Sequence, residues 1–302
     1  MTHRKPHPGQ LDLFLHSDAA VFANDAIDAL RKRDAARAAD CVRRLSAEEP
    51  TYRTLGALQT LCRAVAEWPF PATSPSETAA AVSRLEAEVE PAAGSVMREE
   101  AQKFMRTFWC DLAKTASLHA YDADFPQSFC AGLYLRCGDN SAAVNAAESV
   151  ANRDDNPDAL HCLAVAQYRI GGLEACRNSL MRLALLTPKR LSTAINDIRA
   201  PLLQRDWDAF QDACTWLDPH EETADAWFPA WYLLEHPDNQ VAGVAASLPV
   251  TPAARAFILV GRLIELEKAG YSAALISARS QLRELEPELF ALYMARRQAR
   301  HI

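Results

Sequence analysis

A pair of helical segments that recurs after 33 residues, from Ala131 to Ala164, constrains this chain more than any other feature. The first copy carries an aromatic residue, a turn glycine and small or apolar residues at helical spacing: Ala131, Tyr134, Gly138, Ala143, Ala147 and Val150. In the second copy, apolar residues, small residues and a glycine take the matching places, and the copy ends at a proline: Leu160, Leu163, Ala164, Gly171, Cys176, Leu180, Leu183 and Pro188. A hairpin of two short helices cannot bury its apolar face alone, so such hairpins stack on their neighbours.

This order of small residues, aromatic, turn glycine and closing proline resembles the tetratricopeptide repeat. The resemblance implies an all-α fold, a right-handed α-solenoid of helical hairpins that is clearest over residues 128–188 and partly degenerate elsewhere. It also implies that the first helix of each hairpin lines a concave face, which would bind an extended peptide or a partner helix. We expect five residues to line this groove: Gln127, Tyr134, His161, Gln167 and Tyr168. Because helical repeats serve many unrelated tasks, the resemblance predicts a protein or peptide partner without identifying it.

Helical patterns extend this organisation to both ends of the chain. Near the N-terminus, apolar helix faces lie on either side of a turn at Asp34 and end before Pro50: Phe22, Ala26, Ala29 and Leu30, then Ala38, Val42 and Leu45. At the other end, segments 252–268 and 271–285 form a hairpin around Gly270, and a terminal helix starts at Pro287. We expect residues 1–16 to be a tail and residues 17–302 to form one repeat domain.

The formal net charge of -7 argues against direct nucleic-acid binding, because phosphate binding requires Lys and Arg gathered on one face. The basic residues that do cluster lie at the two ends, where we expect solvated tails: Arg4, Lys5, Arg296, Arg297, Arg300 and His301. The eight cysteines are single residues on apolar helix faces, which is typical of buried thiols in a reducing compartment. No apolar run has the length of a signal peptide or a transmembrane helix. The sequence therefore predicts a cytoplasmic, soluble protein with no membrane partner.

Motifs for catalysis or cofactor binding are absent from the sequence. Neither a glycine-rich phosphate loop nor a G-x-S-x-G nucleophile motif occurs. His220-Glu221-Glu222 lacks a second histidine at helical spacing, so we expect an exposed loop there and no metal site. The consecutive acids Glu99-Glu100 and Asp154-Asp155 cannot present two carboxylates from one helix face, and we expect solvated charge. We therefore predict no enzyme activity, no cofactor and no metal.

Aromatic residues are concentrated in one stretch of the C-terminal half. Four of the six tryptophans lie close together in sequence: Trp207, Trp216, Trp227 and Trp231. Aromatic side chains dominate both cores and binding hot spots, so two interpretations stay open. The cluster is either a bulky core, or a ligand or peptide groove walled by Trp227, Trp231 and Tyr232. An enzyme would show a deep pocket with perturbed titratable groups near this cluster.

The segment Gln10-Leu11-Asp12-Leu13-Phe14 resembles the peptide by which bacterial replication and repair proteins dock on the DNA polymerase sliding clamp. All five residues match. By this resemblance Leu13 and Phe14 would enter the apolar cleft of the clamp, and Gln10 would hydrogen-bond at its rim, as linear docking peptides do. The alternative is that Leu11, Phe14 and Leu15 begin the apolar face of the first helix. An accessory factor tethered to the sliding clamp is therefore a second hypothesis for function.

Overall fold

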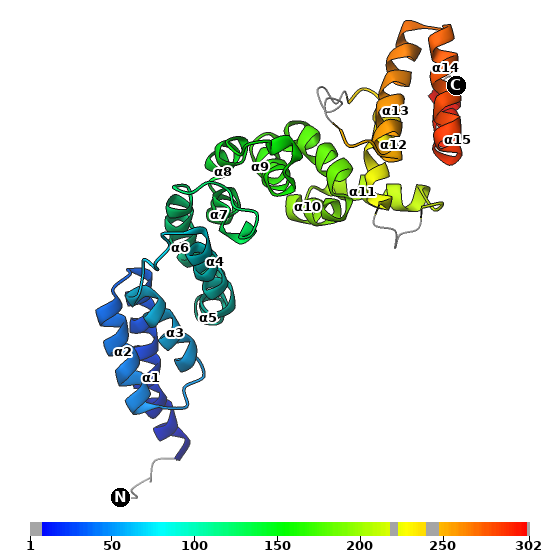
Figure 1. Ribbon diagram of the computed structural model, residues 1–302. Helices are drawn as coiled ribbons and strands as arrows, with labels where there is room; N and C mark the ends of the chain where they lie inside the picture. Colours follow the sequence, from blue (N-terminus) through cyan, green and yellow to red (C-terminus); the bar gives the residue numbers. More distant parts are fainter. Residues whose placement is uncertain (1–7, 218–222, 240–247, 301–302) are drawn as a thin grey trace, which may run out of the picture. The chain divides into compact units, whose positions relative to one another are not determined.

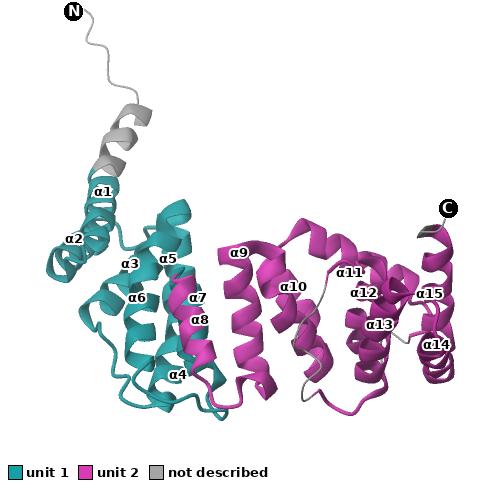
Figure 2. Ribbon diagram, turned by 90° about the horizontal axis from the view of Figure 1, so that it is seen from above, with its two compact units in different colours: residues 1–138 teal, residues 139–302 magenta. Residues whose placement is uncertain are grey.

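The structure is a computed structural model that describes residues 8–217, 223–239 and 248–300, without the side chains of residues 8–17 and Arg300. Every regular element in these ranges is a helix (Figure 1). The chain divides into two compact units, Met1–Gly138 and Asp139–Ile302, coloured separately in Figure 2. In the ranges described, no helix combines the length and apolarity needed to cross a membrane. The all-α prediction is confirmed, and the prediction of one continuous domain over 17–302 stays a prediction.

The described residues of unit 1 form seven α-helices: α1 (Pro8–Arg31), α2 (Ala35–Glu48), α3 (Leu55–Ala66), α4 (Pro75–Arg84), α5 (Glu90–Met97), α6 (Ala101–Ala116) and α7 (Cys130–Cys137). A π-helical turn, Leu85–Val89, joins α4 to α5. Helices pack mainly on their neighbours in the chain, α1 on α2, α2 on α3, α5 on α6 and α6 on α7. One apolar core, including Leu30, Leu58 and Phe108, runs through these contacts. The predicted N-terminal hairpin around Asp34 is confirmed.

In the part of unit 2 that the structure describes there are eight α-helices: α8 (Asn140–Glu148), α9 (Pro157–Leu186), α10 (Leu191–Ile198), α11 (Pro201–Ala213), α12 (Phe228–Glu235), α13 (Pro252–Ala269), α14 (Ala273–Leu285) and α15 (Pro287–Arg300). Here too α8 packs on α9, α9 on α10, and α12 to α15 on one another in succession (Figures 1 and 2). The predicted hairpin around Gly270 and the terminal helix from Pro287 are confirmed.

Short polar side chains start many of these helices. The N-cap side chain accepts a hydrogen bond from a backbone N–H of the first turn at six places: Asp34, Ser74, Asp139, Asn156, Thr251 and Ser272. Such caps satisfy N–H groups that have no partner within the helix. Prolines follow Ser74, Asn156 and Thr251, at the first helical position, where a missing N–H costs nothing. These local signals explain why several helix starts are readable in the sequence.

A period of 33 residues predicts that each helix boundary of the second copy is that of the first shifted by 33 residues. This is wrong, because the two copies differ in length. The left-handed turn glycine of the first copy is Gly138, with φ 78°. In the second copy the turn is Gly172, with φ 73° and ψ -163°, and not the neighbouring Gly171. Gly172 divides α9 into two arms, and the first arm, from Pro157, is longer than α7. The small residues nevertheless lie where expected, since Ala131, Ala143 and Ala164 are each 0% exposed.

Candidate functional site

The five residues expected to line one groove are divided between the two units. Gln127 and Tyr134 belong to unit 1, where Gln127 is exposed and Tyr134 packs against the core. His161, Gln167 and Tyr168 lie on the first arm of α9 in unit 2 and are partly exposed. The structure therefore groups three of the five on one helix, and a groove shared by all five stays a prediction.

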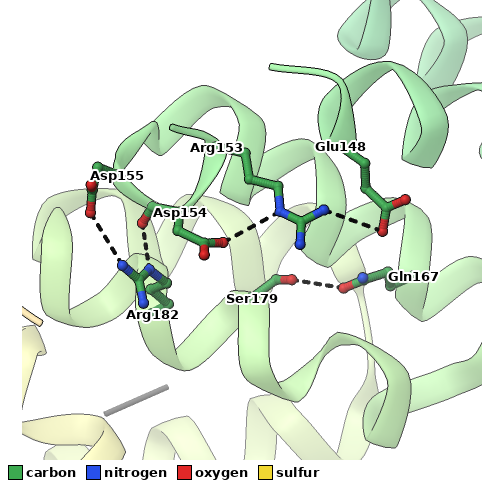
Figure 3. Close-up of polar contacts among 7 residues, drawn as sticks. All are labelled: Glu148, Arg153, Asp154, Asp155, Gln167, Ser179 and Arg182. Atoms are coloured by element: carbon green, nitrogen blue, oxygen red, sulfur yellow. Dashed lines mark hydrogen bonds and ion pairs between the residues drawn. The ribbon is translucent and has the colours of Figure 1, made fainter. Parts of the chain in front are cut away.

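Two of the three residues on α9 use their polar groups within the protein. The Nε2 atom of His161 lies 2.9 Å from Oδ2 of Asp197. The Oγ of Ser179 donates a hydrogen bond of 2.8 Å to Oε1 of Gln167, which ties the two arms of α9 together across Gly172 (Figure 3). This bond occupies one of the two acceptor positions of the Gln167 oxygen.

A buried arginine next to these residues anchors the loop before α9. Arg182 is only 7% exposed, and its Nε donates to the backbone oxygen of Asp154 (Figure 3). Its Nη2 lies 3.2 Å from Oδ1 of Asp155, while Arg153 pairs with Asp154 and Glu148. Asp154 and Asp155 carry solvated charge as expected, since their side chains are 58% and 60% exposed, and each also pairs with an arginine. This network holds a short 3₁₀ turn, Arg153–Asp155, against the second arm of α9.

The aromatic stretch forms core packing in this structure. Trp231 is 2% and Tyr232 is 1% exposed, and the rings of Trp207, Phe210 and Phe228 contact one another at centroid distances of 5.4–5.5 Å. Trp216 and Trp227 are half-buried against the neighbouring C-terminal core. The bulky-core interpretation therefore describes Trp231 and Tyr232, which do not wall an open groove. Burial raises the pKa of the Asp225 carboxyl nearby.

Beside this core lies a polar cluster that the sequence did not predict. The buried carboxylate of Asp206 contacts Nε2 of His236 at 3.0 Å, and the ring of His236 packs on Tyr232 at 4.5 Å. Asn239 donates a hydrogen bond of 3.2 Å to the Tyr232 hydroxyl. Asp206 is 30 residues from His236 in the chain, so no local spacing signals the pair.

The predicted loop at His220-Glu221-Glu222 lies outside the described residues. Among the described residues, no group of three metal-binding side chains occurs.

A cleft of about 680 Å³ lies in the C-terminal part of unit 2, and we call it the C-terminal cleft. Apolar side chains and charges of both signs line it: Ile264, Leu275, Tyr271 and Pro237, with Glu235, Asp238, Glu267, Lys268, Arg279 and Arg297. Tyr271 is 81% exposed and follows Gly270, whose φ of 98° turns the chain between α13 and α14. Neither Trp227 nor Trp231 reaches this cleft. Its volume is within the range of ligand-binding clefts, about 300–1,000 Å³.

Glu267 organises the charged side of the C-terminal cleft. It accepts hydrogen bonds from Arg279 at 2.9 Å and from the Tyr293 hydroxyl, and Arg297 lies 3.3 Å away. Burial, together with the bond to Glu267, raises the pKa of Tyr293 to about 12, so this hydroxyl stays protonated and donates to the carboxylate. At the edge of the cleft, Arg296 pairs with Glu235 at 2.7 Å. The expectation that Arg296 and Arg297 belong to a solvated tail is therefore wrong.

The C-terminal cleft depends on how consecutive helices pack, because its charged residues come from the end of α12 and the segment after it and from α13, α14 and α15. A pattern search along one helix cannot find such a site, although the exposed tyrosine after Gly270 was a usable signal. Comparisons with known proteins found no matching protein-family model, no matching curated protein and no matching solved structure.

Proposed function

We propose that this protein is a cytoplasmic adaptor built from tetratricopeptide-type hairpins in a right-handed solenoid. It acts by binding an extended segment or a helix of a protein partner, and not by catalysis. Packing of helices mainly on their chain neighbours within each unit supports the repeat architecture. Six of the eight cysteines are buried, which suits small apolar thiols in a reducing compartment.

The C-terminal cleft is the observation that carries this proposal. An exposed tyrosine beside apolar side chains is typical of the residues that contribute most to protein binding. The three acidic and three basic side chains around it are partly paired, so they can orient a peptide without adding a large net charge. We therefore expect the partner segment to carry apolar anchors that pack on Tyr271, Ile264 and Leu275.

A displayed random-peptide library, selected against the full-length protein, tests the proposal. We expect selected peptides to bind through the cleft, so that Tyr271→Ala weakens them at least tenfold, or about 1.4 kcal/mol. Leu202→Ala is the matched control, because Leu202 is 59% exposed in the same unit and does not line the cleft. Peptides that bind Tyr271→Ala as tightly as the parent would contradict the cleft as the docking site. Peptides that depend instead on Tyr168 would move the site to α9.

The second candidate is an accessory factor tethered to the DNA polymerase sliding clamp through Gln10–Phe14. The full five-residue match supports it. These residues fall in the first turns of α1, and their side chains lie outside the described residues. Docking as a linear peptide would require this end of α1 to open, which makes clamp binding and helix formation alternatives for one segment.

A further inference from the structure

A second cleft, in unit 1, has a charge opposite to that of the whole chain. It has a volume of about 550 Å³, and five cationic side chains line it: Arg31, Arg33, Lys103, Arg106 and Lys114. Only two carboxylates, Glu100 and Asp111, lie among its lining residues, whereas the chain carries a net charge of -7. We call it the Arg33 cleft. Positive charge has thus been concentrated at one hollow of an acidic protein.

The carboxylates of the Arg33 cleft already have partners. Glu100 pairs with Arg31 at 2.7 Å, and Asp111 accepts a hydrogen bond of 3.1 Å from Trp68. In the described part of the chain, no ion pair is formed by Lys103 or Arg106, both of which are exposed on α6. The positive charges of Lys103 and Arg106 therefore remain available to attract an added anion.

The backbone at Arg33 is unusual for an arginine. Arg33 has φ 57° and is the second residue after α1, which ends at Arg31. Its N–H bonds to the oxygen of Leu30 at 3.0 Å, and the N–H of Asp34 bonds to the oxygen of Ala29 at 2.9 Å. This is the Schellman ending of a helix, in which glycine usually takes the left-handed position. A residue other than glycine in this strained backbone conformation suggests a functional role for its side chain.

The guanidinium of Arg33 is held in a fixed place within the cleft. Its Cζ lies 3.9 Å from the ring centroid of Phe108 and 4.5 Å from that of Phe104, and Nη2 donates to the Phe104 backbone oxygen at 2.7 Å. The other terminal nitrogen, Nη1, is buried and has no hydrogen-bond partner in the described residues. Burial lowers the pKa of this guanidinium to about 10, which still leaves it charged at neutral pH. A fixed, charged donor that lacks an acceptor is matched by a carboxylate oxygen.

We propose that the Arg33 cleft binds an acidic segment of a protein partner, with a carboxylate on Arg33 and flanking acids on Lys103 and Arg106. The apolar walls, Met97 and Phe104, take an adjoining apolar side chain of the same segment. Nucleic acid fits less well, because five cations gathered in one hollow of an acidic chain do not form the extended basic face that a phosphate backbone requires. This site lies in unit 1 and is independent of the C-terminal cleft in unit 2.

The test uses the full-length protein and a fluorescein-labelled peptide of sequence Glu-Glu-Phe-Leu-Glu-Glu. Fluorescence anisotropy should show saturable binding that weakens with added salt, because exposed charges are screened. The analogue with every Glu replaced by Gln should bind at least tenfold more weakly. Arg33→Gln should cause a similar loss, and Lys103→Gln with Arg106→Gln should weaken binding severalfold without risk to the core, since both side chains are exposed.

Arg53→Gln is the matched control, because Arg53 is exposed in the same unit and does not line the cleft. It should leave the dissociation constant unchanged, as should Tyr271→Ala, whose effect reports only on the C-terminal cleft. Arg33→Lys, which keeps the charge but loses the planar fork, should bind more weakly than the parent. No binding up to about 1 mM peptide, equal binding of the Gln analogue, or tighter binding of a single-stranded oligonucleotide would overturn the proposal.

Discussion

The break in α9 makes a quantitative prediction about Gly172. With φ 73° and ψ -163°, this residue occupies a region that is essentially restricted to glycine. A Cβ at Gly172 would meet no atom within 4 Å, so the cost of Gly172→Ala comes from the backbone and not from a clash. We expect Gly172→Ala to destabilise the protein by about 1–3 kcal/mol.

A glycine-to-alanine substitution within α13 should have the opposite effect on the free energy of unfolding. Gly261 has ordinary helical geometry, and a Cβ there would contact Cδ1 of Leu233 at 3.9 Å, which is normal van der Waals distance. Gly261→Ala should therefore stabilise by about 0.5–1 kcal/mol, because alanine loses less backbone entropy in a helix. Both glycines lie in unit 2, so the two variants alter the same unit.

Urea unfolding followed by tryptophan fluorescence measures both effects. Four of the six tryptophans, including Trp207 and Trp231, lie in unit 2, so the signal reports mainly on that unit. The midpoint should fall for Gly172→Ala and rise for Gly261→Ala, with unchanged slopes. If Gly172→Ala stabilised the protein as much as Gly261→Ala, α9 would be one continuous helix and the argument would fail.

Four further predictions concern thiols, packing, the N-terminus and pH. Burial raises the pKa of Cys62 and Cys176 to about 11 and of Cys214 to about 12, so these thiols should resist a thiol reagent until unfolding. Ala164→Leu should overpack the core and cost about 1–3 kcal/mol in urea unfolding, whereas exposed Ala273→Leu should not. If Leu13 and Phe14 dock on the clamp, substituting both by Ala should abolish clamp binding and leave the melting temperature unchanged. If they pack within the protein, each substitution should lower the free energy of unfolding by about 2–5 kcal/mol. The hydrogen bond from the Tyr293 hydroxyl to Glu267 stabilises the fold fully below the unfolded-state pKa of about 10. The stability lost in Tyr293→Phe should therefore diminish as pH rises from 10 towards 12.

Features encoded within one helix or turn could be predicted from the sequence. Asp34, Gly138 and Gly270 mark real turns because their caps and φ angles depend on neighbouring residues alone. The turn in the second repeat could not be fixed in this way, because Gly171 and Gly172 are adjacent and either can adopt a positive φ.

The clefts could not be predicted, because their residues come from separate helices. Glu267, Arg279 and Arg297 meet only after α13, α14 and α15 have packed. Arg33 lies 71 residues from Phe104, whose backbone oxygen it binds. One local signal was available, since an arginine occupies the second position after α1, where a glycine or asparagine is usual.

Stability alone does not explain why position 33 is an arginine. The left-handed backbone costs a residue with a Cβ about 1–2 kcal/mol, and a buried N–H without an acceptor costs about 1–3 kcal/mol. Packing of the guanidinium on Phe104 and Phe108 returns about 0.5–2 kcal/mol, and a charged hydrogen bond to a backbone oxygen about 1.5–3 kcal/mol. These contributions nearly cancel, so glycine at the same turn would leave the fold about as stable. An acceptor brought by a partner would remove the unpaired N–H and turn the balance in favour of arginine, which is the physical reason for placing an acidic ligand at this turn.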